Sequence, residues 1–181
     1  MIKPEGKIMF QPLKPFFINQ EFGQNTVCTE TPMGFLEGRT FLWCDGNNPP
    51  EGMRSVYGDG GHKGIDLRAG RWRPAMCVQR GKVVYIDKNE KSGFDVRIES
   101  TERGFTFTHI YEHLEKWNCE VGDYVETGVL VGWTGNTGYS TGPHLHFECR
   151  DENGVSFDPI PYMYEAPADT ILKMRSTIEY I

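Results

Sequence analysis

The sequence predicts a mainly β protein, with antiparallel sheets in a compact, sandwich- or barrel-like arrangement. Three observations support this fold class. The chain has 21 glycines, 11 prolines and 13% aromatic residues, which suits short strands and many turns better than a helical bundle. Strand-like runs recur about every ten residues, with turn signals between them. At 181 residues, we expect a single domain over 1–181.

The first third of the chain predicts edge strands and then a long loop. The apolar runs 8–10 and 16–18 are interrupted by Pro12 and Pro15, which favours short edge strands over a helix. Residues 24–61 are rich in glycine and turn signals. We interpret them as a loop insertion that lines a cleft and governs substrate choice, because so long a connection in a compact domain is usually functional.

The remaining strands are predicted downstream. Six runs rich in β-branched and aromatic residues are strand candidates, namely 82–86, 94–98, 105–111, 123–125, 129–132 and 144–149. The tail 163–181 changes character after Asp158-Pro159. Its apolar residues between Asp169 and Ile181 predict a short amphipathic helix, capped by Asp169, that packs on the domain.

Charge and hydropathy exclude several classes of partner. The net charge is −6 and no basic stripe is present, which argues against nucleic acid. No run of 18 apolar residues occurs, so no membrane span is expected. The first residues lack the apolar region of a signal peptide. We therefore expect synthesis in the cytoplasm and export by another route if the protein acts outside the cell.

The five cysteines predict free thiols rather than a metal site. They include no Cys-x-x-Cys pair, and their number is odd. Cys149 lies close to a His-x-His motif, but strand alternation places it with Leu145 and Phe147, on the other face from the histidines. We therefore predict that Cys149 packs in the core and is not a nucleophile.

The histidines carry the strongest chemical signal. The chain has five, and three of them fall in the motifs His62-x-x-x-Asp66 and His144-x-His146. In an extended segment the members of each motif share a face. Two imidazoles and one carboxylate form a three-ligand set that leaves a fourth tetrahedral position open for water. This pattern predicts a catalytic metal site.

Several further motifs appear in a fixed order around these histidines. They are Gln20-Glu21-Phe22-Gly23, Gly81-Lys82-Val83-Val84, Tyr111-Glu112-His113-Leu114, the run from Val121 to Gly128, the run from Gly135 to Gly142, and Asp158-Pro159. With the two histidine motifs, they resemble the lysostaphin-like (LytM-type) zinc metallopeptidases. Apart from the 24–61 insertion, the resemblance covers most of residues 16–162.

The resemblance implies one zinc ion and cleavage of peptide cross-links in bacterial peptidoglycan. It implies that His62, Asp66 and His146 are the zinc ligands, and that His113 and His144 are the catalytic pair. His144 is expected to be the general base, and His113 to hydrogen-bond the oxyanion or the nucleophile. A hydrolase without a signal peptide fits a bacteriophage lysis or virion-associated enzyme.

Two residues keep alternative interpretations. If residues 107–113 are extended, His109 shares a face with His113, and we interpret His109 as a residue of the cleft wall rather than the catalyst. Glu148 is either an acceptor for a ligand histidine or a solvated side chain.

Two other functions are suggested by parts of the sequence. A non-catalytic relative that binds or regulates cell-wall enzymes is expected to lose at least one of the five site residues, and all five are present. A biotinyl or lipoyl carrier is suggested by the run from Val121 to Gly128. A carrier needs a modifiable lysine, and none lies between Lys116 and Lys173.

Overall fold

The computed structural model describes residues 5–23 and 62–165. Within these ranges the protein is nearly all β, and the helical part is a single 3₁₀ turn, η2 (Ile160–Tyr162). The predicted fold class is therefore confirmed. The 24–61 insertion with Cys28 and Cys44, and the helix expected from Asp169 to Ile181, lie outside the described residues.

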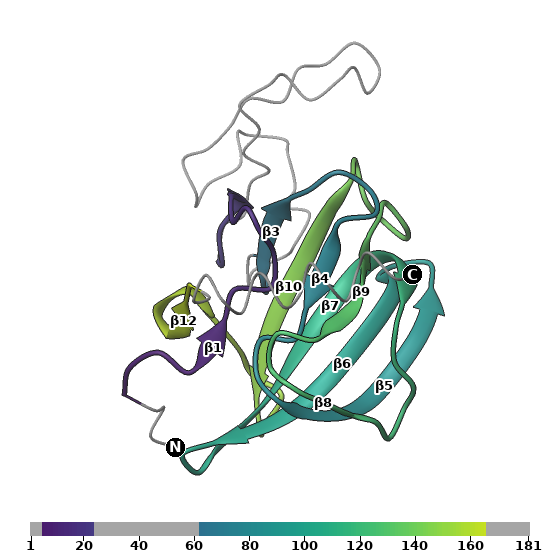
Figure 1. Ribbon diagram of the computed structural model, residues 1–181. Coiled ribbons are helices and arrows are strands. Elements are labelled where there is room, and N and C mark those ends of the chain that lie inside the picture. Colours follow the sequence, from purple (N-terminus) through teal and green to yellow (C-terminus); the bar gives the residue numbers. More distant parts are fainter. Residues whose placement is uncertain (1–4, 24–61, 166–181) are drawn as a thin grey trace.

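One antiparallel sheet organises the described part of the chain (Figure 1). Its central path follows the order β2-β3-β10-β7-β6-β5-β8, while β11 pairs with β10 and β9 pairs with both β4 and β7. The strands are β2 (Ile18–Gln20), β3 (Ile65–Arg68), β4 (Pro74–Met76), β5 (Gly81–Asn89), β6 (Gly93–Glu102), β7 (Phe105–Trp117), β8 (Tyr124–Val125), β9 (Leu130–Thr134), β10 (His144–Asp151) and β11 (Ser156–Phe157). All six predicted downstream strands overlap an observed strand.

A second, two-stranded sheet differs from the antiparallel expectation. β1 (Met9–Phe10) and β12 (Met163–Tyr164) pair in parallel, with Met9 opposite Met163. The amide of Ile8 also donates to the Tyr162 carbonyl, at 2.8 Å. In Figure 1 this pair lies beside the main sheet. The first residues of the predicted tail, 163–164, are thereby held on the domain.

The two faces of the main sheet have different chemistry. Leu67 of β3, Phe147 of β10, Tyr111 of β7 and Val96 of β6 are fully buried on one face. They share a core with residues of β1, β4 and β9. Cys149 is fully buried in the same core, as predicted, and burial raises the pKa of its thiol well above the ordinary value. The opposite face of β3, β10 and β7 is left for polar side chains.

Within residues 5–23 and 62–165, no helix is both long and apolar enough to cross a membrane.

Candidate active site

Strand register brings the two histidine motifs together. β3 and β10 are antiparallel neighbours, and Asp66 lies directly opposite His146. Directly opposite residues in an antiparallel pair point to the same face, so the carboxylate and the imidazole meet. Residues two apart along β10 share that face as well, which adds His144.

Three side chains offer donor atoms close enough to hold one cation. His146 Nδ1 lies 2.9 Å from Asp66 Oδ1 and 3.0 Å from His62 Nε2, and His62 Nε2 lies 3.3 Å from Asp66 Oδ1. With zinc–ligand bonds of about 2.0–2.2 Å, the edges of a tetrahedral ligand set are about 3.3–3.6 Å long. The observed triangle is within a few tenths of an ångström of these edges. The three residues therefore fit a zinc ion, with small outward shifts.

His62 reaches the site by a different path from the one expected. The sequence suggested that His62 and Asp66 share the face of a strand, but β3 begins only at Ile65. The chain instead passes very close to β10 at Gly64, where a Cβ atom would lie 2.4 Å from the Phe147 carbonyl oxygen. Glycine permits this approach and lets His62 turn back over Asp66. His62 Nδ1 lies 3.1 Å from the Glu21 carbonyl oxygen and donates a hydrogen bond to it. In the neutral ring, Nε2 therefore carries a lone pair that can bind a metal.

The electrostatics of the three side chains favour a cation between them. Burial alone would raise the pKa of Asp66, but the hydrogen bond from His146 and the charge of that ring hold it well below its usual range. Burial alone would lower the pKa of His146, and Asp66 raises it to about 9. The proton on His146 therefore occupies the position that a cation would take. Metal binding at this site releases that proton.

Two further imidazoles face the three donor atoms. The ring centroids of His113 and His144 are 4.8 Å apart, and those of His113 and His146 are 6.0 Å apart. His113 Nδ1 lies 2.9 Å from the Thr137 carbonyl, and His144 Nδ1 lies 2.8 Å from the Gly142 carbonyl. Because a carbonyl can only accept, Nδ1 carries the proton in each neutral ring. Each Nε2 is therefore a basic lone pair, and that of His144 lies 3.6 Å from Asp66 Oδ1.

His113 joins this face because β7 has a bulge. Tyr111 pairs with Val96 and Leu114 with Phe94, so β7 has one more residue than β6 over this interval. His113 itself has a positive φ of 62°. The extra residue leaves Tyr111 and Leu114 on the core face and turns His113 to the opposite face.

His109 does not lie in the cleft, so that interpretation was wrong. Its side chain is fully buried on the core face, where Nε2 lies 2.8 Å from Ser100 Oγ and Nδ1 lies 3.0 Å from Tyr111 Oη. Burial lowers the pKa of His109 to about 3. Simple alternation placed His109 with His113, and the bulge between them reverses that relationship.

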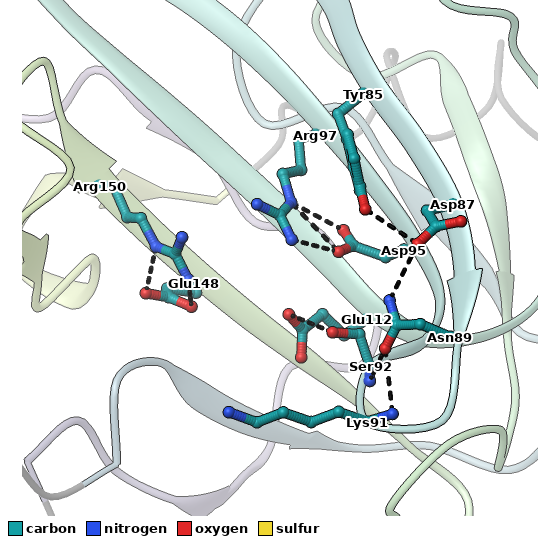
Figure 2. A network of polar contacts seen from close by, with 10 residues as sticks. All are labelled: Tyr85, Asp87, Asn89, Lys91, Ser92, Asp95, Arg97, Glu112, Glu148 and Arg150. Atoms are coloured by element: carbon teal, nitrogen blue, oxygen red, sulfur yellow. Dashed lines mark hydrogen bonds and ion pairs between the residues drawn. The ribbon is translucent and has the colours of Figure 1, made fainter.

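Glu148 is neither solvated nor hydrogen-bonded to a site histidine among the described residues. It is 2% exposed and accepts two hydrogen bonds from Arg150, at 2.7 and 2.9 Å, and one from Ser156. Burial alone would raise the pKa of Glu148, but these hydrogen bonds lower it. Figure 2 shows this ion pair beside a second one, between Asp95 and Arg97. Both lie on the same sheet face as His146.

The structure adds two residues that the sequence interpretation missed. Gln20 lies opposite Asp66 on β2, and Glu112 lies opposite His146 on β7. Glu112 accepts a hydrogen bond from Ser92 Oγ at 3.1 Å (Figure 2). Both residues stand inside the motifs that carry the family resemblance. Strand pairing, which those motifs do not show, is what places them beside the candidate metal ligands.

Comparison with known proteins identifies the family. The model of peptidase family M23 matches residues 60–159, which contain every one of the site histidines. The chain belongs to peptidase family M23. This membership makes it a metallopeptidase-type hydrolase, and the predicted resemblance is confirmed.

Two known proteins are similar to part of this chain. Lysostaphin of Staphylococcus simulans is 36% identical over 110 residues, which is 59% of this chain and 22% of lysostaphin. The DD-carboxypeptidase/endopeptidase Mpg of Neisseria gonorrhoeae is 32% identical over 106 residues, 59% of this chain and 24% of Mpg. The chain thus spans less than a quarter of the length of these two relatives.

A solved M23 structure extends the similarity over more of the chain. It is the catalytic domain of the prophage-encoded M23 protein EnpA of Enterococcus faecalis, in its A109H form. The similarity has a TM-score of 0.57 at 25% identity and covers 82% of this chain and 92% of the chain of that catalytic-domain structure.

Proposed function

We propose that this M23 peptidase is a zinc-dependent endopeptidase that hydrolyses peptide cross-links of bacterial peptidoglycan. The observation that carries the proposal is the arrangement of five side chains. His62, Asp66 and His146 form a triangle with the size of a zinc ligand set. His113 and His144 lie beside it, each anchored through Nδ1 to a backbone carbonyl. Ligands and bases on one face are what metal-assisted hydrolysis requires.

Zinc, when held by His62, Asp66 and His146, lowers the pKa of a bound water to about 7 and polarises a carbonyl. His144 then acts as the general base, because its Nε2 is free to accept the proton of the attacking water. The Gly142 carbonyl fixes the ring through Nδ1. After the transfer, the Nε2–H of His144 can return the proton to the leaving amine nitrogen.

His113 is assigned to orient the nucleophile rather than to donate to the oxyanion. Burial, together with the nearby His144, lowers the pKa of His113 to about 4, so the ring is neutral near pH 7. Its Nδ1–H is committed to the Thr137 carbonyl. Its Nε2 is therefore an acceptor, which suits a hydrogen bond from water and not one to an oxyanion.

The substrate class is supported by the names of the relatives. Mpg is described as a carboxypeptidase and endopeptidase, and ALE-1 of Staphylococcus capitis, at 36% identity over 110 residues, as a glycyl-glycine endopeptidase. Both names describe hydrolysis of peptide bonds, which is the reaction proposed for this site.

We also infer that the protein acts on the cell wall, as a bacteriophage lysis or virion-associated enzyme. The support is the prophage origin of EnpA, whose M23 structure covers 82% of this chain. A non-catalytic, wall-binding role is the alternative. The presence of all five site residues in working geometry favours the enzyme.

Digestion of purified peptidoglycans tests the proposal. Walls with glycine bridges and walls with direct cross-links are incubated with the protein, and the products are analysed by mass spectrometry. We expect new amino termini at one type of cross-link, loss of activity with a chelator, and recovery with zinc. Release of sugar fragments, or no release from any wall with zinc supplied, would contradict the proposal.

A further inference from the structure

A hollow of about 360 Å³ lies between the end of β3 and the segment before β2. Its charged lining residues are all cationic, namely Lys14, Arg68 and Arg73. Leu13, Pro15 and Phe17 of the segment before β2 also line it, together with Ala69 and Gly70 after β3. No acidic residue among the described ones lines it.

Arg68 connects the hollow to the catalytic machinery. It lies on β3 directly opposite His144, so both side chains leave the sheet on the face that carries Asp66. In such a pair the Cβ atoms are about 5 Å apart. The backbone N–H of Arg68 donates to the Phe17 carbonyl at 2.8 Å, which fixes the strand beside the hollow.

The three cationic side chains differ in their hydrogen-bond partners. Lys14 Nζ is bound to Gln11 and Glu165, at 2.7 and 2.9 Å, and Arg73 Nη2 donates to the Lys14 carbonyl. The guanidinium of Arg68 is exposed and has no hydrogen bond or ion pair within residues 5–23 and 62–165. Its charge is therefore available to a ligand.

The other arginines of the same sheet face behave differently. Arg97 is paired with Asp95, which is fully buried, and Arg150 with Glu148, which is 2% exposed (Figure 2). Those charges are neutralised within the protein, whereas Arg68 has no such carboxylate. The site therefore lies between a neutralised end and a cationic end.

We propose that the hollow binds a carboxylate of the peptide substrate through Arg68. The inference rests on the proposed function and deepens it by naming a substrate feature. The planar guanidinium fork matches a carboxylate in two parallel hydrogen bonds. Phe17, which is 59% exposed, offers an apolar surface for the methylene groups next to that carboxylate. Because Arg68 lies opposite His144, a carboxylate bound by Arg68 lies within one or two residues of the scissile bond.

Two carboxylates of a stem peptide have this chemistry. One is the C-terminal carboxylate of an uncross-linked D-alanyl-D-alanine stem, and the other is the α-carboxylate of its γ-linked D-glutamate. The probes are the stem peptide itself, its C-terminal carboxamide, and its D-isoglutamine form. Binding to the zinc-loaded His113→Ala protein is measured by calorimetry, which needs no turnover.

We expect the stem peptide to bind more tightly than one of the two amidated forms, and the form that loses affinity identifies the carboxylate. Arg68→Gln should lower the affinity for the stem peptide about 10- to 100-fold, as expected for lost charge-assisted hydrogen bonds. It should leave the affinity for that amidated form nearly unchanged. Arg68→Lys should lie between, because it keeps the charge without the fork. Arg80→Gln, at an exposed arginine between β4 and β5, is the matched control.

The proposal is overturned if Arg68→Gln lowers the affinities for the carboxylate and amide probes equally, or lowers neither affinity. It is also overturned if both amidated forms bind as tightly as the stem peptide. Because the readout is binding, these results stand whether or not the wild-type protein cleaves peptidoglycan. A failure of the proposed function is seen instead in the digestion assay.

Discussion

His109 and His113 lie four residues apart on β7, and both are buried, but they belong to opposite faces of the sheet. His109 bonds to Ser100 and Tyr111 inside the core. His113 bonds to a loop carbonyl at Thr137 and turns its other nitrogen toward His144. Burial lowers the pKa of both rings. Burial and a lowered pKa therefore do not distinguish these two histidines, whereas the face of the sheet on which each side chain lies does.

The largest expected effect is on catalysis, and it should appear at only one of the two positions. His113→Ala removes the group that orients the nucleophile and should lower kcat/KM about 10²–10⁴-fold. His109→Ala should lower it less than tenfold, measured at a temperature where the variant is folded. Peptide release from purified walls gives both rates. A larger loss for His109→Ala would place the wrong histidine in the site.

The next effect is on stability, with the order reversed. His109→Ala leaves a cavity in the core and removes a hydrogen-bond partner from Ser100 and Tyr111. We expect a loss of about 2–4 kcal/mol in the free energy of unfolding. The same change at His113 should cost less, since that ring faces the cleft. Urea denaturation of the zinc-free proteins compares them, and equal losses would mean that the two environments do not differ as described.

The pH dependence of the free energy of unfolding tests the burial of His109 in the core. The folded-state pKa of His109 is about 3, against an ordinary value of 6.5. Between these values the unfolded chain binds a proton that the folded protein does not, so stability falls as pH falls. His109 alone contributes a slope of about 1.4 kcal/mol per pH unit in this window. His109→Gln should reduce the slope by that amount between pH 6.5 and pH 4. Parallel curves for wild type and variant would contradict this assignment.

The smallest effect concerns the bulge. His113 has a φ of 62°, a conformation that glycine adopts without strain. His113→Gly should therefore be more stable than His113→Ala by about 1 kcal/mol, although both variants lose the imidazole. Thermal denaturation of the pair measures the difference. If the alanine variant is equally stable, the left-handed backbone at residue 113 carries no strain.

Much of the site was readable from the sequence because its residues lie in short motifs. The motifs His62-x-x-x-Asp66 and His144-x-His146 predicted a metal site, and the resemblance added His113 and divided the ligands from the catalytic pair. The structure brings all five together. Periodicity failed where the backbone departs from a regular strand. His62 precedes β3 rather than lying on it, and the bulge separates His113 from His109.

Strand register and strand pairing could not be predicted from the sequence either. Nothing in the local pattern shows that Glu148 is bound by Arg150 and Ser156, or that Glu112 lies opposite His146. The parallel pairing of β1 with β12 joins segments about 150 residues apart and has no local signal. The same limit applies to Arg68, whose place beside His144 follows only from the β3–β10 register.

Zinc stoichiometry measured together with peptide cleavage tests the central claim most directly. Wild type, His146→Ala and His113→Ala are dialysed against a weak chelator, and bound zinc is determined by elemental analysis. The account predicts one zinc in wild type and in His113→Ala, none in His146→Ala, and cleavage of peptidoglycan by wild type alone. Full zinc retention by His146→Ala, or loss of zinc from His113→Ala, would contradict the assignment of ligands and catalytic bases.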